Sequence, residues 1–177
     1  MSKPPLIKTR DNLSIIATSL ALLDAEERGA GALAALLGVM PPDAWPPEFN
    51  GPKTRAWMRD MLNRHADEPG YGSWYVVADG RLIGICGFKG PPDHLGEVEI
   101  GYSVMQSYQR KGFATGAVGL LVARAFRDPR VAAVAAETLP SLIASQTVLI
   151  RNGFSLVSRR ADDDLGEILR FARRRAA

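Results

Sequence analysis

The chain has 177 residues, of which 46% are hydrophobic and 23% charged, and this composition is typical of one globular domain with a substantial core. Its formal net charge of +3 argues against a nucleic-acid-binding protein, and no stretch approaches the roughly 20 apolar residues of a membrane span. One cysteine, Cys86, excludes an intramolecular disulfide, and the first five residues lack the apolar core of a signal peptide. We therefore expect a single domain over residues 1–177, located in the cytoplasm and without contact to a membrane.

Turn residues and hydrophobic spacing predict the elements of the first half of the chain. Ser19 is suited to cap a helix, five prolines between residues 39 and 52 predict a loop, and Asp79 and Gly80 predict a tight hairpin. The expected elements are a strand or hairpin over residues 6–9 and 13–18, helices over 20–27, 32–37 and 53–65, and strands over 73–78 and 81–88.

The most informative segment runs from residue 97 to residue 115, where a strand leads through a basic turn into a helix. From Thr115 onward the apolar residues recur with helical spacing. The N-terminus of a helix carries unpaired N–H groups and the positive end of the helix dipole, and both attract phosphate. Gly112 would allow the backbone to approach a ligand closely, and Arg110 and Lys111 add positive charge. The segment therefore predicts a cradle for a pyrophosphate.

The residues of this turn match one known family better than the common nucleotide-binding motifs. The chain lacks both the P-loop pattern and the Gly-x-Gly-x-x-Gly pattern of dinucleotide-binding folds. The pattern Gln-x-x-Gly-x-Ala, preceded by Glu-Ile-Gly-Tyr, resembles the GNAT superfamily of acetyl-CoA-dependent N-acetyltransferases. The resemblance assigns contacts with acetyl-CoA to Val104, Gln109, Arg110, Lys111, Gly112, Phe113, Ala114 and Thr115.

The second half of the chain continues the order of elements of that family. Residues 131–136 are a short apolar run typical of a buried strand, and Ser141 is a candidate N-cap for a helix that reaches Asn152. Residues 144–154 resemble the second helix that flanks the cofactor. The resemblance is plain over residues 72–171, and it is strongest to the branch that contains the ribosomal-protein N-terminal acetyltransferases.

The fold implied by the resemblance is α/β (α+β), the GNAT acyl-CoA N-acyltransferase fold. It has a mixed, mostly antiparallel central sheet flanked by helices. Its fourth and fifth strands, expected over residues 97–105 and 131–138, splay apart, and the pantetheine arm of the cofactor bonds to the backbone groups that the splay leaves unpaired. A hairpin over residues 154–171 is expected to close the sheet.

The resemblance implies transfer of an acetyl group from acetyl-CoA to a primary amine, by direct attack of the neutral amine on the thioester and without a metal. His65, His94 and Cys86 lack the spacing of metal ligands. A base must take the amine proton, and Glu97 and Glu99 share one face of their strand. The family places a glutamate near the amine at the position of Glu99, often acting through water. The alternative for Glu99 is a solvent-exposed carboxylate or an ion-pair partner, and Glu97 is the second candidate.

The groups that stabilise the oxyanion and the thiolate are assigned by the same resemblance. The oxyanion donor is the backbone N–H near Val104. Ser145 matches a serine that some relatives place near the sulfur, where its hydroxyl would act as the catalytic donor. The alternative for Ser145 is an ordinary helix serine that packs against the cofactor.

The chain departs from the family at two positions of the second helix. Many members carry a tyrosine where this chain has Leu149, and a common pattern has asparagine where it has Leu142. Tyr102 and Tyr108 are candidate replacements for the tyrosine, although Tyr102 is expected to pack in the sheet. These departures leave open an alternative, a protein that binds acyl-CoA as a sensor without catalysis.

The acceptor is a peptide N-terminus or a small-molecule amine, because the branch includes enzymes of both kinds. An α-amine has a pKa near 8 and a lysine side chain near 10.4, so neutralising the α-amine at pH 7 costs roughly 3 kcal/mol less. Trp45, Phe49 and Trp57 line a pocket for this acceptor, or they anchor the proline-rich loop to the body of the protein. A homodimer is compatible with the sequence.

Arginines crowd the C-terminus of the chain. They form a patch for RNA or another acidic partner, or they lie in a solvated tail beyond the last strand. The small net charge favours the tail, and nucleic acid is therefore not expected as a partner. The residues concerned are Arg170, Arg173, Arg174 and Arg175.

Overall fold

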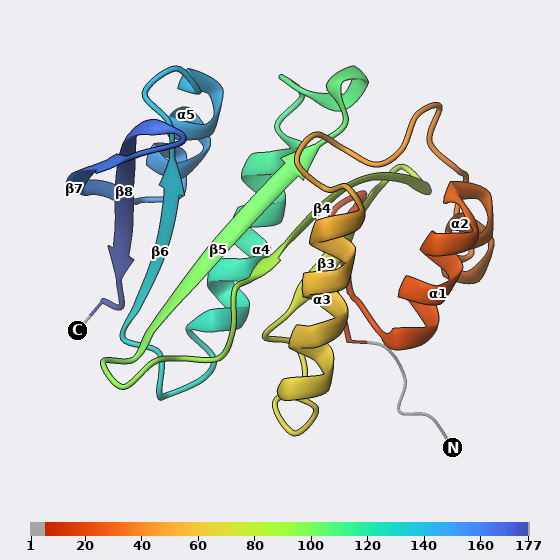
Figure 1. Ribbon diagram of the computed structural model, residues 1–177, viewed down its shortest axis with the longest axis horizontal. Helices are drawn as coiled ribbons and strands as arrows, with labels where there is room; N and C mark the ends of the chain where they lie inside the picture. The colour runs from red at the N-terminus through yellow and green to blue at the C-terminus, as the bar shows by residue number, and fades with distance from the viewer. Residues whose placement is uncertain (1–5, 177) are drawn as a thin grey trace.

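The computed structural model describes residues 6–176 and contains an eight-stranded sheet with helices on both faces (Figure 1). Residues 1–5, on which the signal-peptide expectation rests, lie outside the described part. None of the helices within residues 6–176 is long and apolar enough to cross a membrane. In chain order the elements are β1 (Ile7–Arg10), β2 (Leu13–Ala17), α1 (Leu20–Arg28), α2 (Ala30–Leu37), α3 (Pro52–Arg64), β3 (Ser73–Ala78), β4 (Arg81–Phe88), β5 (Glu97–Val104), a 3-10 turn (Gln106–Tyr108), α4 (Phe113–Ala125), β6 (Ala133–Thr138), α5 (Ile143–Arg151), β7 (Ser155–Asp162) and β8 (Gly166–Arg174).

The sheet is mixed and mostly antiparallel, as the family resemblance implies. Its strand order is β1-β2-β3-β4-β5-β6-β8-β7, in which β5 and β6 run parallel and the other neighbours antiparallel. Asp79 and Gly80 have φ values of +50° and +70°, the left-handed conformations that the tight turn between β3 and β4 requires. Ser19 caps α1 as expected, because its hydroxyl accepts a hydrogen bond from the Leu22 N–H (3.3 Å).

Apolar side chains cover both faces of the sheet. On one face α4 and α5 pack against the larger cluster, which includes Trp74, Val118 and Leu149. On the other face α1, α2 and α3 pack against a second cluster, which includes Met58 and Tyr75. Figure 1 shows α3 in front of β3 and β4, and α4 behind the sheet. Because strand side chains alternate, the neighbours Trp74 and Tyr75 enter different layers.

The parallel pair β5 and β6 splays apart halfway along β5. Pairing begins at Glu97 opposite Ala133 and ends at Ile100 opposite Ala136. Residues 101–104 keep their partners in β4 but have none in β6. The expected splay is therefore confirmed. Its strands are the fifth and sixth in chain order, because the N-terminal segment forms the hairpin β1–β2 rather than one strand.

The start of α5 differs from the expectation. The helix begins at Ile143 with Leu142 in the N-cap position, and no side chain caps it. Ser141 therefore lies before the cap, and its assignment as the N-cap is wrong. The chain turns there through a hydrogen bond from the Leu142 N–H to the Leu139 carbonyl (3.0 Å), and the helix begins one residue later than expected.

The C-terminal arginines belong to the sheet, so their assignment to a solvated tail is wrong. β8 continues to Arg174, three residues beyond the expected end of the hairpin. Arg173 Nη1 donates a hydrogen bond to the Asn152 carbonyl (2.8 Å). Beyond the strand, the Arg175 guanidinium donates to three carbonyls at the end of α4 and before β6, those of Val131 (2.9 Å), Phe126 (2.7 Å) and Asp128 (2.6 Å).

Candidate active site

The turn before α4 has the geometry expected of an anion site. Gly112 occupies the N-cap position with a φ of +85°, a conformation that favours glycine. No side chain caps α4, and a Cβ built on Gly112 would meet no atom within 4 Å. Arg110 and Lys111 are exposed beside it. The first-turn N–H groups of a helix have no partner within the helix, so this open, basic turn fits a pyrophosphate.

Gln109 and Tyr108 position the turn. Gln109 Nε2 donates a hydrogen bond to the Val104 carbonyl (3.0 Å), which joins the turn to the end of β5. Lys111 Nζ lies 5.3 Å from the centroid of the Tyr108 ring. Both contacts hold the basic residues near the end of β5. A direct contact of Gln109 with the cofactor, and the oxyanion role of the Val104 N–H, stay predictions.

Asn152 joins the two helices that flank the splay. Its Nδ2 donates to the Thr115 carbonyl in the first turn of α4 (3.1 Å) and to the Val148 carbonyl in α5 (2.9 Å). A Cβ at Gly119 of α4 would lie 3.2 Å from Asn152 Oδ1, so the helices approach closely at this point. The sequence identifies Asn152 as the end of a helix and gives no signal for this bridge.

Tyr102 and Ser145 meet across the splay. The Tyr102 hydroxyl lies 2.9 Å from Ser145 Oγ and 2.9 Å from the Ser145 carbonyl oxygen, so it connects β5 to α5. Burial raises the pKa of Tyr102 to about 12. The Tyr102 ring packs against the core as expected, while its hydroxyl reaches the predicted site residue. Leu149, where relatives carry a tyrosine, is fully buried.

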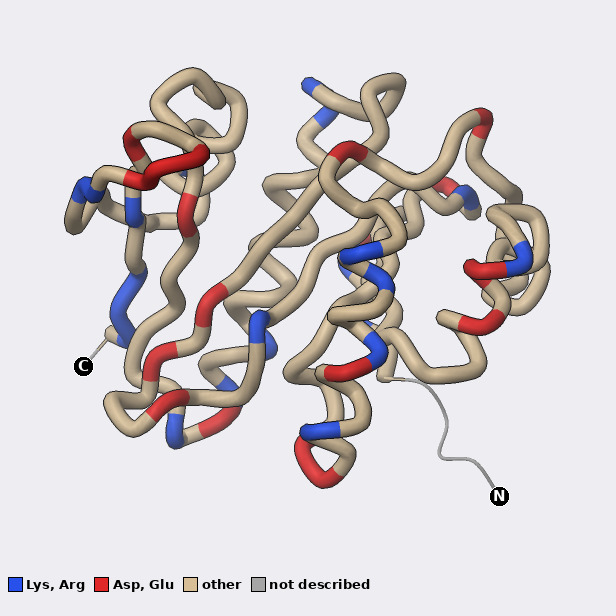
Figure 2. The backbone as a smooth tube through the Cα atoms, viewed as in Figure 1, with Lys and Arg blue, Asp and Glu red and all other residues tan. Residues whose placement is uncertain are grey.

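Glu99 lies in a network of charges that crosses β5, β6 and β8. Its carboxylate forms an ion pair with Lys89 and a second one with Arg170 (3.4 Å). Arg170 also pairs with Glu97 and with Glu137 (3.2 Å). Figure 2 shows acidic positions on β5 and β6 and basic positions on the adjoining β8. The structure thus shows the ion-pair alternative for Glu99, and its role as a base stays a prediction.

A cavity of about 350 Å³ lies on the α3 face of the sheet, beside the splay. Gly101, Tyr102 and Ser103 form part of its wall, and all three belong to the stretch of β5 that has no β6 partner. Its apolar wall includes Phe49 at the end of the proline-rich loop and Trp57 of α3. The cavity therefore reaches the sheet where the splay begins.

The three aromatic residues divide between the two alternatives of the sequence analysis. Trp45 anchors the proline-rich loop to α1, because its Nε1 donates a hydrogen bond to Oε1 of Glu26 (2.9 Å), a buried residue of that helix. The Tyr75 hydroxyl donates to the other oxygen of Glu26 (2.6 Å). Phe49 and Trp57 line the cavity instead.

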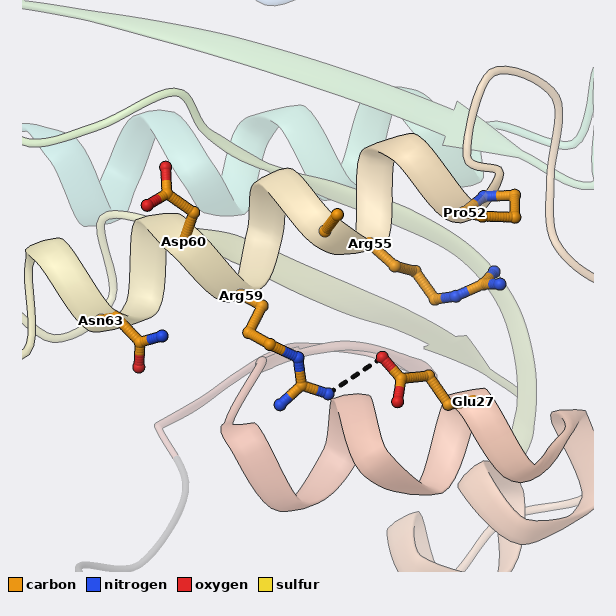
Figure 3. Close-up of a pocket in the computed structure, with 7 residues that line it drawn as sticks. Glu27, Pro52, Arg55, Arg59, Asp60 and Asn63 are labelled. Carbon is orange, nitrogen blue, oxygen red and sulfur yellow. Dashed lines mark hydrogen bonds and ion pairs between the residues drawn. The ribbon is translucent and has the colours of Figure 1, made fainter.

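A hollow of about 500 Å³ lies between α1 and α3 (Figure 3). Its walls carry charged side chains that already have partners, since Arg59 pairs with Asp24 (2.8 Å) and with Glu27 (3.0 Å). None of the residues that line it comes from β5, α4 or α5. Among residues 6–176, no group of three or more His, Cys, Asp or Glu side chains is arranged to hold a metal ion.

Comparison with known families agrees with this geometry. A family model described as an acetyltransferase (GNAT) domain matches residues 21–155. The chain therefore belongs to the GNAT family of acetyltransferases. It is an acetyl-CoA-dependent acetyltransferase, which confirms the resemblance.

Relatives and solved structures cover nearly the whole chain. The uncharacterized N-acetyltransferase YjdG of Bacillus subtilis (strain 168) is 28% identical over 154 residues, which are 86% of this chain and 91% of that protein. The ribosomal-protein α-N-acetyltransferase RimL, in complex with coenzyme A, superposes with a TM-score of 0.73 at 19% identity. The superposition covers 96% of this chain and 98% of the RimL chain. The microcin C7 self-immunity acetyltransferase MccE, in complex with acetyl-CoA and AMP, gives a TM-score of 0.69 at 16% identity, covering 93% of both chains.

Proposed function

We propose that this acetyltransferase acetylates a primary α-amine, at a peptide N-terminus or on a small molecule. The observation that carries the proposal is the position of the 350 Å³ cavity, whose wall includes residues 101–103. The same residues form the unpaired edge of the splay. An acceptor in the cavity and an acetyl group held in the splay would therefore meet at this stretch of β5.

Acetyl-CoA supplies the acetyl group as an activated thioester. The N–H groups at the start of α4 bind its pyrophosphate, Gly112 permits the close approach, and Arg110 and Lys111 contribute charge. The backbone groups of residues 101–104 that have no β6 partner bind the amides of the pantetheine arm. RimL was solved with coenzyme A and MccE with acetyl-CoA, which supports acetyl-CoA as the acetyl donor.

The residues around the splay then serve the transfer. Glu99 accepts the amine proton through a water molecule, and the Val104 N–H donates to the oxyanion. The Lys89 partner of Glu99 has a side chain that is 52% exposed, so water can compete for this carboxylate. Ser145 donates a hydrogen bond to the sulfur.

An α-amine suits this site better than the side chain of a lysine. The proposed base is shared with two cations, and an α-amine needs less help to lose its proton at pH 7. The apolar wall that Phe49 and Trp57 provide fits an acceptor with an apolar group beside the amine. The similarity to RimL, an enzyme that acts on a ribosomal protein, supports a peptide N-terminus as one such acceptor.

The test is a calorimetric titration with acetyl-CoA followed by an acceptor panel. The protein should bind acetyl-CoA at one site. Thiol release at pH 7 should then be faster with peptide N-termini and small α-amines than with peptides whose only free amine is a lysine side chain. Turnover restricted to lysine side chains, or no turnover with any amine, would contradict the proposal.

A further inference from the structure

Thr138 carries a buried hydroxyl without a hydrogen-bond partner at the end of β6. Within residues 6–176, its Oγ1 is one of two buried side-chain polar atoms that have no hydrogen-bond partner, and the residue is only 6% exposed. An unpaired buried hydroxyl costs stability, so its presence in a native protein requires an explanation. A ligand that reaches the end of β6 would provide the missing partner.

The register of the sheet places Thr138 opposite Tyr102 across the splay. Ile100 and Ala136 are the last pair between β5 and β6, and Tyr102 and Thr138 each lie two residues further along. Because strand side chains alternate, Tyr102 and Thr138 lie on the same face as Ile100 and Ala136. Ile100 and Ala136 belong to the larger core cluster together with Leu149 of α5. The shared face is therefore the one that α4 and α5 cover. The two hydroxyl-bearing residues therefore flank the gap on the α5 side.

The contact between Tyr102 and Ser145 can release a hydrogen-bond donor without moving a heavy atom. The Tyr102 hydroxyl has one proton and two acceptors at 2.9 Å, the Ser145 carbonyl and Ser145 Oγ. When Tyr102 donates to the carbonyl, Ser145 can donate to the Tyr102 oxygen. When Tyr102 donates to Oγ instead, the serine proton is free for a ligand.

We propose that the Thr138 and Ser145 hydroxyls donate hydrogen bonds to the sulfur of the departing coenzyme A thiolate while Tyr102 positions Ser145, and we call these three residues the donor set. This inference rests on the proposed function. As the amine nitrogen bonds to the acetyl carbon, the carbon–sulfur bond breaks and its electron pair stays on sulfur. The amine proton leaves through water toward Glu99. The donor set takes the place of the tyrosine that relatives carry at the position of Leu149, which is an apolar core residue here.

These hydroxyls stabilise the thiolate and do not protonate it. The pKa of Tyr102 is raised to about 12, whereas an ordinary thiol has a pKa near 8.5, so proton transfer from Tyr102 through Ser145 to sulfur is uphill. Hydrogen bonds to a charged acceptor are stronger than those to a neutral one. The donor set therefore binds the thiolate more tightly than the thioester, and it favours the transition state in which charge develops on sulfur.

Calorimetry with coenzyme A and with desulfo-coenzyme A, which lacks the sulfur, tests the donor set without turnover. The wild type should bind coenzyme A more tightly, and this advantage should grow as the pH rises through the pKa of the thiol. Thr138→Val and Tyr102→Phe should each reduce the advantage about tenfold at about pH 9 and leave the affinity for desulfo-coenzyme A unchanged. Thr147→Val is the matched control, because this threonine lies on the exposed side of α5, where its hydroxyl donates to the Ile143 carbonyl (2.9 Å).

Two further readouts separate the donor set from a structural role. Thr138→Val should unfold at the same or a higher temperature than the wild type, because it removes an unpaired buried hydroxyl. The pKa of bound coenzyme A, followed by the ultraviolet absorbance of its thiolate, should be higher in Thr138→Val than in the wild type. The single cysteine does not interfere, because burial holds the pKa of the Cys86 thiol far above its usual range.

The outcomes distinguish this inference from the proposed function. If Thr138→Val keeps the wild-type preference for coenzyme A over desulfo-coenzyme A, the donor set is overturned while the acetyltransferase site stands. If the folded wild type binds neither coenzyme A nor desulfo-coenzyme A, the proposed function is contradicted, and the inference that rests on it falls with it. Equal losses for both ligands in Thr138→Val would show a packing defect in the splay, which also overturns a specific contact with sulfur.

Discussion

Gly112 brings together a left-handed backbone, open space and the start of a helix. Gly112→Glu would place a carboxylate where the pyrophosphate is expected, so the affinity for acetyl-CoA should fall at least about tenfold by calorimetry. Gly166 in the turn between β7 and β8 is a close match, with a φ of +79° and no atom within 4 Å of a Cβ. Gly166→Glu introduces the same strain and charge and should keep the affinity. Similar losses in both variants would speak against the cradle.

Glu99 can be tested as a base separately from its ion pairs. Glu99→Gln should lower turnover about 100-fold near pH 7 and much less near about pH 9.5, where an α-amine is neutral without help. Thiol release measured across this pH range gives the ratio of the two rates. Glu97→Gln is the control, since it also removes a partner of Arg170. A ratio that does not change with pH, or equal effects of both variants, would assign Glu99 to the ion-pair network alone.

The charges of β6, β7 and β8 link strands that are not all neighbours. Arg160 of β7 reaches over β8 to Glu137 of β6, with Nη2 2.9 Å from the carboxylate. The hydrogen bond from Arg160 is the main reason that the pKa of Glu137 lies below its ordinary value of 4.5. A carboxyl with a lowered pKa in the folded state stabilises the fold above its unfolded pKa. That contribution is lost as the pH falls through the folded pKa.

Arg160→Gln should therefore destabilise the protein at pH 7 and much less in acid. The loss in the free energy of unfolding should be modest at pH 7, because the arginine is half exposed, and it should shrink as the pH falls below 4.5 toward about pH 3. Urea denaturation at the two pH values measures it. Arg159→Gln is the matched control, because Arg159 and its partner Glu167 are both about half exposed. An equal loss at both pH values would exclude the pairing with Glu137 as its cause.

Local patterns predict the elements of this fold well where turn chemistry and periodicity agree. β3 and β4 have the expected bounds, because Asp79 and Gly80 define their turn. The start of α5 is predicted wrongly, since Ser141 has the right side chain but the helix begins only after a further turn of the chain. The end of β8 is also missed, because an arginine-rich strand edge looks like a polar tail in the sequence.

The candidate site is predictable only in its local parts. The turn at Gly112 is a continuous motif, so its residues can be read directly from the sequence. The contacts of Arg170 with Glu97 and Glu99 join residues 73 and 71 positions apart, and no local pattern encodes them. The same holds for Tyr102 and Ser145, which meet only because β5 and β6 part beside α5.

At the scale of the whole molecule, the basic turn and the cavity lie on opposite faces of the sheet, and both are next to the splay between β5 and β6. The face under α4 and α5 carries the basic turn, while the face under α3 carries the cavity. The splay is where the sheet opens between these faces, because residues 101–104 lack β6 partners. Under the proposed function, acetyl-CoA and the acceptor amine would thus approach the splay from opposite faces of the sheet. β8 holds β6 in place on its outer side, so the geometry of the splay depends on the C-terminal strand.

Deletion of residues 172–177 should therefore damage the whole domain rather than remove an appendage. It takes away the β8 residues opposite the first half of β6 and the Arg175 contacts to three carbonyls, so we expect a loss of at least about 3 kcal/mol in the free energy of unfolding. Urea denaturation and acetyl-CoA titration should both show the defect. Arg174→Gln, which keeps the strand pairing of its backbone, should unfold like the wild type. A truncated chain with wild-type stability but weaker RNA binding would instead show that these arginines act as a nucleic-acid tail.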